Sequence, residues 1–363
     1  MILLRLKKQI ILLFALLGFS YSLSAQDSTI SVFDGLFESA PFAKPFVSEM
    51  HSTVTKIEIG YSKSYSEFNM QEESVKFNRP MVEVHWGIDA PLYAQKFGKL
   101  ADNSPKWGFA LSLPLSVHIL EDMWDPITAA VINTDYRFGS PRLRYIRYIS
   151  ANKYFKNISF SWLPMFHECT HLGDEITIYR VDANLPIRRV NVSYEYSEFQ
   201  LTLNDPDGTR ENRHSVKIGG MYRISNRGYG WFSFRKDAEM IGDIAIENST
   251  HRIESYVQYQ FQRVKGFLAG KRAMNVFSIE ARNRVRYGYP IYKMVNNEWV
   301  EKPVQERLEW CFNAYFGWKF LPKSDAKQSI GFYLHGYKGL APYGQMRNYP
   351  SYPFFGASLT YEP

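Results

Sequence analysis

The sequence predicts an all-β protein: a transmembrane β-barrel of about 12 antiparallel strands that follows a cleaved signal peptide. Three observations lead to this prediction. The chain begins with a secretory leader, aromatic residues make up 16% of it, and long segments alternate between apolar and small or polar residues. Membrane-spanning strands alternate in this way, with an apolar face toward lipid and girdles of aromatic residues at both membrane surfaces.

Residues 1–25 have the composition of a secretory signal peptide. Three basic residues precede a short apolar run over 10–20, and small residues lead to a cleavage site near Ala25. An apolar run of this length is too short to span a bilayer as a helix. We therefore expect residues 1–25 to be removed on export, and the absence of a cysteine at the cleavage site disfavours a lipid anchor.

The mature chain divides into a short lead-in and one large domain. Residues 26–50 are expected to form a periplasmic lead-in and residues 51–363 the barrel. The leader carries three basic and no acidic residues, so its removal lowers the formal charge from +7 to +4, too little to indicate a nucleic-acid partner. The two cysteines, Cys169 and Cys311, form no disulfide framework.

The strand signal is clearest in two segments. In KWGFALSLPLSVHIL (106–120) and RLEWCFNAYFGWKF (307–320) apolar residues recur at every second position. Ordinary strands have about five or six residues, so these are long enough to cross a membrane at a tilt. Similar segments number twelve: 52–66, 79–92, 106–120, 130–148, 156–168, 187–203, 213–226, 250–264, 273–288, 304–320, 328–338 and 351–361.

An even strand number is usual for single-chain bacterial barrels. If both termini are periplasmic, the loops after odd-numbered strands face outward, and these loops are on the whole the longer ones, as expected for outer-membrane barrels. The last strand, in FFGASLTYEP, resembles the carboxy-terminal signal of such barrels, although two residues follow its final aromatic. A secreted soluble β-sandwich or propeller is the alternative.

The stretch FHECTHLGDE (166–175) contains the zinc-protease pattern H-E-x-x-H. That pattern needs a helix, on which His167 and His171 share one face and grip one metal ion. Four residues of strand span about 13 Å, so the two imidazoles of a strand cannot converge. The alternation over 157–162 predicts a strand that leads into His167, which argues against a zinc protease.

The same stretch resembles a known family. HECTHLGDE is similar to the H-x-S-S-H-L-G-D-E signature of the Gram-negative envelope family called domain of unknown function 1207, and NTDYRFG (133–139) resembles a second pattern of that family. We expect the resemblance to extend over most of the mature chain. It implies an outer-membrane barrel in a Gram-negative bacterium but no chemistry, because the activity of the family is not established.

A second resemblance concerns mechanism. Outer-membrane phospholipase A and the lipid A deacylases carry a His and a Ser two residues apart on a barrel strand at the outer rim, where the His is the base and the Ser attacks an acyl ester. His167 matches the base, and Cys169 stands at the Ser position. A thiol beside an imidazole is a competent nucleophile. The similarity implies an acyl-ester hydrolase that acts on outer-leaflet lipid or lipopolysaccharide.

The strand pattern also predicts the orientation of the motif. If the alternation continues through Pro164, then His167, Cys169 and His171 all point into the lumen at the outer end of the fifth strand. The hairpin turn near residue 152 places Asp135 opposite Cys169. The predicted lumen cluster comprises His118, Asn133, Asp135, His167, Cys169 and His171, with Glu83 and His85 on the same side of the second strand.

Roles in a hydrolase follow from side-chain chemistry. His167 would be the base, Cys169 or Thr170 the nucleophile, and Asp135 or Glu175 the acid that orients the base. The alternative is that these residues only brace a polar lumen by hydrogen bonds. The candidate catalytic residues are thus His167, Cys169, Asp135 and His171, and the candidate lumen residues His118, Asn133 and Glu175.

No cofactor is expected. Asp174 and Glu175, with loop carbonyls, offer oxygen ligands that suit Ca²⁺, but the spacing does not demand a metal. Arg282, Arg284 and Arg286 share one strand face and would bind an anionic solute or, more often, pair with carboxylates such as Glu309.

Three functional classes stay open: a hydrolase at the outer rim, a narrow solute channel, and a structural or accessory barrel. Aqueous channels usually need 16–18 strands, so twelve strands predict a largely filled lumen. The partners expected are outer-membrane lipid or lipopolysaccharide and the barrel-assembly machinery.

Overall fold

The computed structural model describes residues 42–63, 77–100, 105–123, 130–149, 155–172, 187–191, 193–205, 212–224, 228–233, 244–246, 251–264, 273–286, 291–296, 298–302, 305–321, 328–344 and 352–362. The predicted signal peptide, Asp174 and Glu175 lie outside these residues. No helix in the described part of the chain is long and apolar enough to cross a membrane, a finding that does not concern strands.

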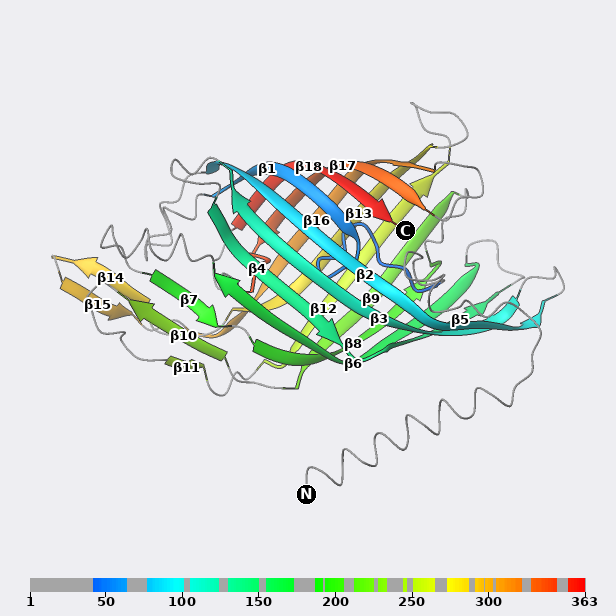
Figure 1. Cartoon of the computed structure of the whole chain (residues 1–363), viewed down its shortest axis with the longest axis horizontal. Helices are drawn as coiled ribbons and strands as arrows, with labels where there is room; N and C mark the ends of the chain where they lie inside the picture. Colours follow the sequence, from blue (N-terminus) through cyan, green and yellow to red (C-terminus); the bar gives the residue numbers. More distant parts are fainter. Residues whose placement is uncertain are drawn as a thin grey trace, which may run out of the picture.

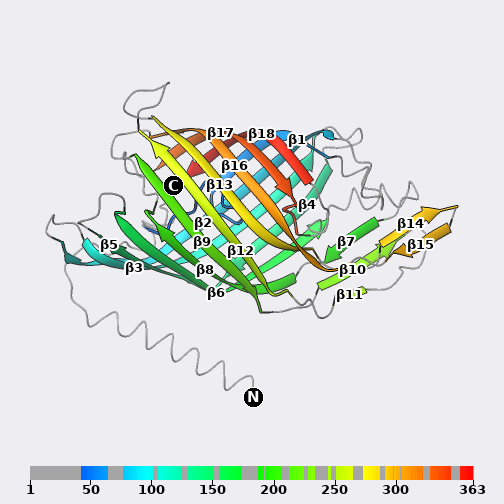
Figure 2. The same cartoon turned by 180° about the vertical axis from the view of Figure 1, so that it is seen from behind.

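The strands pair antiparallel around a closed wall, and β1 pairs with β18 to complete it (Figures 1 and 2). β4 and β5 both lie between β3 and β6 and share one position, so the wall has twelve strand positions, as predicted. The wall strands are β1 (Thr55–Lys63), β2 (Phe77–Lys99), β3 (Pro105–Asp122), β4 (Ala130–Gly139), β5 (Arg142–Tyr148), β6 (Asn157–Leu172), β8 (Ser193–Leu203), β9 (Arg213–Arg223), β12 (Ile253–Arg263), β13 (Ala273–Arg286), β16 (Arg307–Phe320), β17 (Ser329–Gly339) and β18 (Tyr352–Glu362).

Two small sheets extend one end of the barrel. β7 (Ile187–Asn191), β10 (Gly228–Ser233) and β11 (Ile244–Ile246) form one, and β14 (Ile291–Val295) with β15 (Glu298–Lys302) forms the other. All five lie on the left in Figure 1, in connections that follow odd-numbered wall positions. We call this the outer end, because it carries the long loops that the sequence predicts to face out of the cell.

Large apolar side chains cover the outside of the wall. On β16, Trp310, Phe312 and Phe316 are exposed on the isolated chain, whereas the alternate residues Asn313 and Tyr315 are buried. Exposed apolar surface of this extent needs a non-aqueous neighbour, and alternation of apolar-out with polar-in is the pattern of a membrane barrel. The apolar face predicted for the segment 307–320 is thus the outer one.

The inside of the wall is rich in buried charges that occur in pairs. Arg282 donates to Glu280 at 2.6 Å, and Arg286 lies 3.4 Å from Glu309. Two of the three arginines in this row thus pair with carboxylates inside the barrel, as buried charges generally require. Arg144 with Asp89, Arg142 with Glu198 (3.2 Å) and His335 with Glu58 (3.0 Å) are further pairs inside the barrel.

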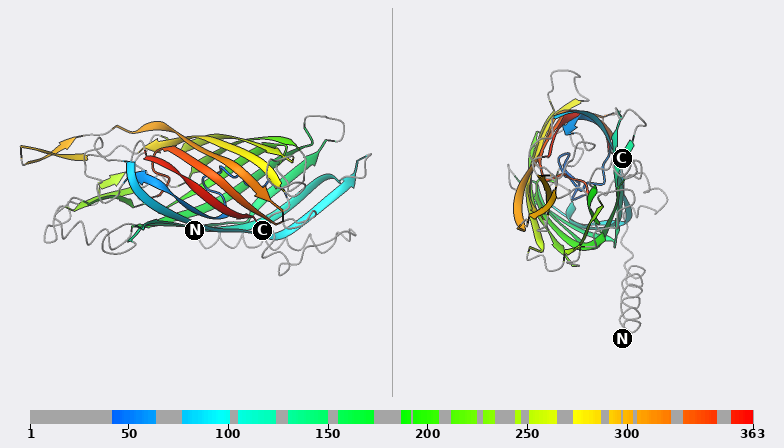
Figure 3. Two further views of the ribbon diagram at one scale, coloured as in Figure 1. Left: turned by 90° about the horizontal axis from the view of Figure 1, so that it is seen from above. Right: turned by 90° about the vertical axis from the view of Figure 1, so that its left-hand side faces the viewer.

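The segment Phe42–Val54, here called the amino-terminal plug, runs inside the barrel (Figure 3, right). Wall side chains satisfy its backbone: Val47 N donates to Gln260 Oε1 at 2.9 Å, and Asn313 Nδ2 donates to Ser48 O at 2.9 Å. Residues 42–50, expected in the periplasm, thus lie in the lumen. Their sequence has no strand periodicity, so only the partners on distant strands reveal their location.

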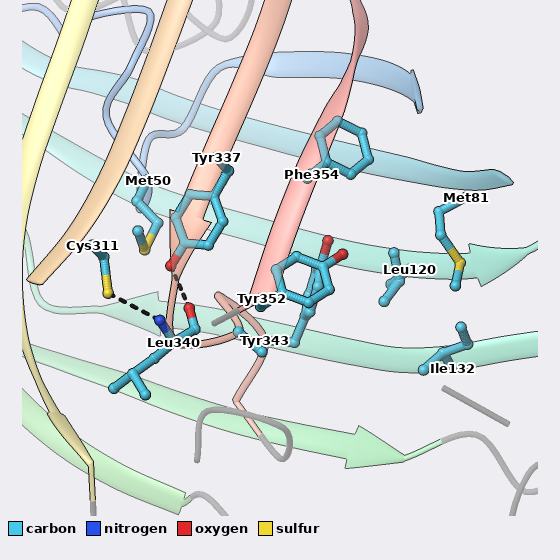
Figure 4. Close-up of a cluster of buried hydrophobic side chains, with 11 residues drawn as sticks. Met50, Met81, Leu120, Ile132, Cys311, Tyr337, Leu340, Tyr343, Tyr352 and Phe354 are labelled. Atoms are coloured by element: carbon cyan, nitrogen blue, oxygen red, sulfur yellow. Dashed lines mark hydrogen bonds between the residues drawn. The ribbon is translucent and has the colours of Figure 1, made fainter. Parts of the chain in front are cut away.

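A second segment, Leu340–Gly344, enters the lumen after β17, and we call it the inserted loop. Leu340 N donates to Cys311 Sγ at 3.3 Å, and the Tyr337 hydroxyl donates to Leu340 O (Figure 4). Met50 of the plug belongs to the same buried apolar cluster as the loop residues. The other members are Met81, Leu120, Ile132, Cys311, Tyr337, Leu340, Ala341, Tyr343, Tyr352 and Phe354. The two segments therefore share one core and fill the lumen together.

The ion pair between Lys217 and Glu49 gives a first testable prediction. It joins β9 to the plug, and both side chains are almost fully buried. We expect Lys217→Met to destabilise the barrel by about 3–5 kcal/mol, because it leaves a carboxylate buried without its cation. Urea unfolding in detergent micelles measures this loss. The double variant Lys217→Met/Glu49→Met should recover most of it, and a double variant as unstable as the single one would contradict this account.

Candidate functional site

Strand β6 changes face in its middle. Ser159, Ser161 and Leu163 are buried on the lumen side, but beyond Pro164 the buried residues are Phe166, Glu168 and Thr170. The pairing of β6 with β8 shifts register between Leu163 and Phe166, which marks an inserted residue. A proline cannot donate to the sheet and is confined to such irregularities, and one extra residue reverses the face of every residue that follows.

The neighbouring position in the wall, which β4 and β5 share, has a matching break between these two strands. In the part of β4 that leads to the break, Asp135 and Arg137 are buried while Tyr136 and Phe138 are exposed, whereas on β5 the buried residues are even-numbered, including Arg142 and Arg144. Ser140, between the strands, donates its backbone N–H to Met165 O at 2.8 Å. The Ser140 hydroxyl also lies 3.1 Å from Met165 N and Met165 O. The two irregularities therefore lie side by side and are joined by hydrogen bonds.

The predicted orientation of the motif is consequently wrong. His167 and Cys169 are partly exposed and His171 is exposed, all on the outer surface of the wall and not in the lumen. The prediction assumed that the alternation continues through Pro164, and the bulge at this proline breaks it. Thr170, the alternative nucleophile, is the residue that faces inward.

On the outer surface His167 has a partner that sequence reasoning missed. Its Nδ1 lies 3.2 Å from Glu195 Oε1 on β8, and its ring centroid lies 5.0 Å from that of Phe138 on β4. The side chains of His167 and Glu195 are 24% and 37% exposed. Glu195 is an acidic residue on a strand face that also carries Ser197, Phe199 and Leu201, and a charge on a largely apolar face is the signal that would have found it.

We call His167, Cys169 and Glu195 the outer-face site. His167 and Cys169 are one pleat apart on the same side of β6, so their Cα atoms are about 6.5–7 Å apart, a separation that the two side chains can close. Within the described residues the imidazole is hydrogen-bonded to Glu195 and not to Cys169. An acid that holds one ring nitrogen leaves the other free to take a proton, which is the arrangement of a base and its orienting group.

Asp135 does not belong to this site. It pairs with Thr170 in the ladder between β4 and β6, while Tyr136 is the residue opposite Cys169. The predicted register is thus one residue off, and Asp135 faces the lumen with no exposed surface. It cannot orient His167, because the wall lies between them.

The lumen residues lie close together near the outer end. The ring of His118 stacks on that of His85 with centroids 4.7 Å apart, and His118 Nε2 lies 3.4 Å from Glu83 Oε2. Asn133 Nδ2 donates to Asp135 Oδ1 at 2.8 Å. Glu83 and Asp135 also accept hydrogen bonds from the inserted loop, which is what a brace of the lumen requires. Glu175 lies outside the described residues.

The space left in this region is small. A cavity of about 20 Å³, with Glu83, His118 and His335 in its lining, has room for about one water molecule. Within the described ranges, no three His, Cys, Asp or Glu side chains are arranged to hold a metal ion. The possible Ca²⁺ ligands Asp174 and Glu175 are not among those ranges.

Comparisons with known proteins bear on the fold. The chain matches no protein-family model and no curated protein, so the resemblance to domain of unknown function 1207 stays a prediction. Similar solved structures are outer-membrane phospholipase A from Escherichia coli (12% identity, 91% of this chain and 96% of that chain covered, TM-score 0.39), the translocator domain of the autotransporter NalP from Neisseria meningitidis (8%, 85% and 85%, 0.36) and the monoaromatic hydrocarbon channel TodX (10%, 92% and 98%, 0.34). At these identities the likeness concerns the outer-membrane barrel fold alone.

The change of face in β6 can be tested by chemical labelling. In lipid vesicles a membrane-soluble maleimide should react with Cys169 about tenfold faster than with a Thr170→Cys variant made in a Cys169→Ser background, because thiol reactivity follows exposure. Cys311 is buried and serves as the internal control. Equal rates, or faster labelling at position 170, would contradict the bulge at Pro164.

Proposed function

We propose that the protein is an outer-membrane barrel of a Gram-negative bacterium that hydrolyses acyl esters of outer-leaflet lipid or lipopolysaccharide at its outer-face site. The observation that carries this proposal is the hydrogen bond between His167 and Glu195, on the same surface as Cys169. A base that is already oriented one pleat from a thiol has the geometry that nucleophilic catalysis needs.

In the proposed reaction Glu195 accepts the Nδ1 proton of His167 as a hydrogen bond and so leaves Nε2 unprotonated. Nε2 takes the proton of the Cys169 thiol, and the thiolate attacks the ester carbonyl carbon. The tetrahedral intermediate collapses to a thioester, and the imidazolium gives its proton to the departing alcohol. Water, deprotonated by His167, then cleaves the thioester to a carboxylic acid and the free thiol.

The surroundings of the site suit a lipid substrate. Tyr136 and Phe138 lie beside it on β4 and are about half exposed on the isolated chain, and Met165 is exposed on β6. These side chains offer an apolar surface for acyl chains. The site lies close to the end of β6 at Leu172, toward the outer end, which is the level expected for ester groups of the outer leaflet.

A purely structural barrel does not need an ionisable pair such as His167 and Glu195 on its outer surface. Ionisable groups on the lipid face of a barrel destabilise it in a depth-dependent way, and such groups within a membrane usually serve a function. A solute channel is less well supported, since the plug and the inserted loop fill the lumen. Both remain as outcomes of the experiments below.

The location has its own test. We expect the mature protein in the outer-membrane fraction, with a gel mobility that changes on heating, because closed barrels resist detergent until heated. Recovery of a soluble periplasmic monomer without detergent would contradict the membrane assignment.

Activity can be tested on the purified barrel with phospholipid and lipopolysaccharide in mixed micelles. We expect His167→Ala to lower kcat by about 10²–10⁴-fold, the usual contribution of a general base, and Cys169→Ala to abolish turnover. Glu195→Gln should have a smaller effect of the same sign. His214→Ala is the matched control, because His214 is another exposed histidine, hydrogen-bonded to Tyr259 on the distant strand β12. A wild type without ester hydrolysis, or equal activity in all variants, would leave a structural barrel.

A further inference from the structure

The reverse side of the outer-face site is packed against the inserted loop. On β6 the outward-facing Cys169 lies between Glu168 and Thr170, both of which are buried on the lumen side. Side chains of successive strand residues point to opposite faces, so the lumen contacts of Glu168 and Thr170 fix the backbone that carries Cys169. Contacts that fix Glu168 and Thr170 therefore also fix the position of the Cys169 thiol.

An ionic ladder joins β6 to β4 on this side. Arg137 Nε lies 3.3 Å from Glu168 Oε2, and Arg137 Nη2 lies 3.6 Å from Asp135 Oδ2. All three side chains are at most 3% exposed. In such surroundings ion pairs are screened little by water and hold the two strands in one relative position.

The inserted loop docks onto this ladder through Gly344. Gly344 N donates to both carboxylate oxygens of Asp135, at 3.1 and 3.2 Å. The backbone of Gly344 also lies directly on Thr170: a Cβ at residue 344 would meet Thr170 Cγ2 at 1.9 Å and Thr170 Cβ at 2.9 Å. Only glycine fits here without movement of the loop or of β6.

The loop is itself held from the other side of the lumen. Arg284 Nη1 on β13 donates to Leu340 O at 3.3 Å and to Ala341 O at 2.8 Å, and the Tyr343 hydroxyl donates to Glu83 on β2. Leu340 and Tyr343 also pack in the buried apolar cluster of Figure 4. The loop is thus a fixed strut between β13, β2 and the back of β6.

From these contacts we propose that the inserted loop positions the outer-face site from inside the barrel, through Gly344, Asp135 and Thr170. The kcat test of this inference rests on the proposed function, whereas the test by alkylation of Cys169 does not. Asp135, expected from the sequence to be a catalytic acid, is in this account a positioning residue that never meets the substrate.

The decisive variant is Gly344→Ala. The added methyl group must push the loop away from Thr170, and a displacement of about 1 Å at a remote contact can lower a rate by about 10²-fold. We expect kcat to fall by about 10–100-fold while KM changes little, because the lipid-binding surface outside the wall is untouched. Gly336→Ala, on the outer face of β17, is the matched control, since a Cβ there meets nothing within 4 Å.

A compensating variant separates positioning from general damage. Thr170→Ala removes the Cγ2 atom that a Cβ at residue 344 would strike. Gly344→Ala/Thr170→Ala should therefore recover part of the lost kcat, because alanine at position 170 keeps only the more distant contact through Cβ. Tyr343→Phe deletes a single hydroxyl that anchors the loop and should lower kcat several-fold even if Gly344→Ala does not fold. Heat-modifiable mobility establishes folding for each variant.

A second readout works without turnover. Iodoacetamide reacts with Cys169 as its thiolate, and in the proposed site His167 promotes formation of that thiolate. His167→Ala in an otherwise wild-type protein should therefore slow the alkylation near neutral pH. In Gly344→Ala that dependence on His167 should be lost, and in the double variant it should return. Folded Gly344→Ala and Tyr343→Phe proteins with wild-type kcat and wild-type alkylation would overturn the positioning role. A wild type that hydrolyses no ester but shows the alkylation pattern would overturn the proposed function and support the positioning role.

Discussion

The strict alternation of side chains in a closed wall governs the rest of this structure. Every wall residue faces either lumen or lipid, and a single inserted residue reverses the assignment for the remainder of its strand. Here the insertion at Pro164 is matched by the break between β4 and β5, and Ser140 joins the two through Met165. Because both neighbouring positions shift together, lumen residues still oppose lumen residues, as Asp135 opposes Thr170. Toward β8, which has no break, the shift of register absorbs the extra residue of β6, so that buried Phe166 opposes buried Tyr196.

Two non-strand segments occupy the lumen that this wall encloses. The amino-terminal plug and the inserted loop have no sheet of their own, so their backbone groups bond to wall side chains such as Gln260, Asn313 and Arg284. Each such side chain is buried and would be costly without its partner. The polar lining and the two segments therefore depend on each other, and the wall residues that look like ligands for a solute are largely engaged by the chain itself.

The alternation of side chains also explains which parts of this structure the sequence predicts. Period-two alternation is a local signal, so all twelve wall positions could be predicted from segments such as 106–120 and 307–320. Their boundaries were less accurate: the segment 79–92 is part of the longer β2, and the segment 187–203 joins β7 of a small sheet to β8. Which residues in the outer half of β6 face inward could not be predicted in this way. Pro164 indicates an irregularity but not the number of residues that it inserts. The plug and the loop were missed because their contacts join residues far apart in the chain, as between Gly344 and Asp135. Glu195 carried a readable signal, a charge on an apolar face, but only the register of β6 with β8 makes it the partner of His167.

The corrected orientation changes which chemistry the motif can reach. Inside the lumen, His167 and Cys169 would have faced the space beside Thr170 that the inserted loop occupies. In the proposed hydrolase the outer location needs no entrance or channel, because a lipid substrate reaches the site by diffusion along the bilayer. The apolar surroundings strengthen the hydrogen bond between His167 and Glu195 relative to water and also make the pair costly to keep there. A site with this cost needs rigid support that does not obstruct the lipid face, and the only side of β6 available for that support is the lumen. The ladder of Asp135, Arg137 and Glu168 occupies that side, so the polar cluster that first suggested catalysis is better understood as the foundation of a site on the opposite surface.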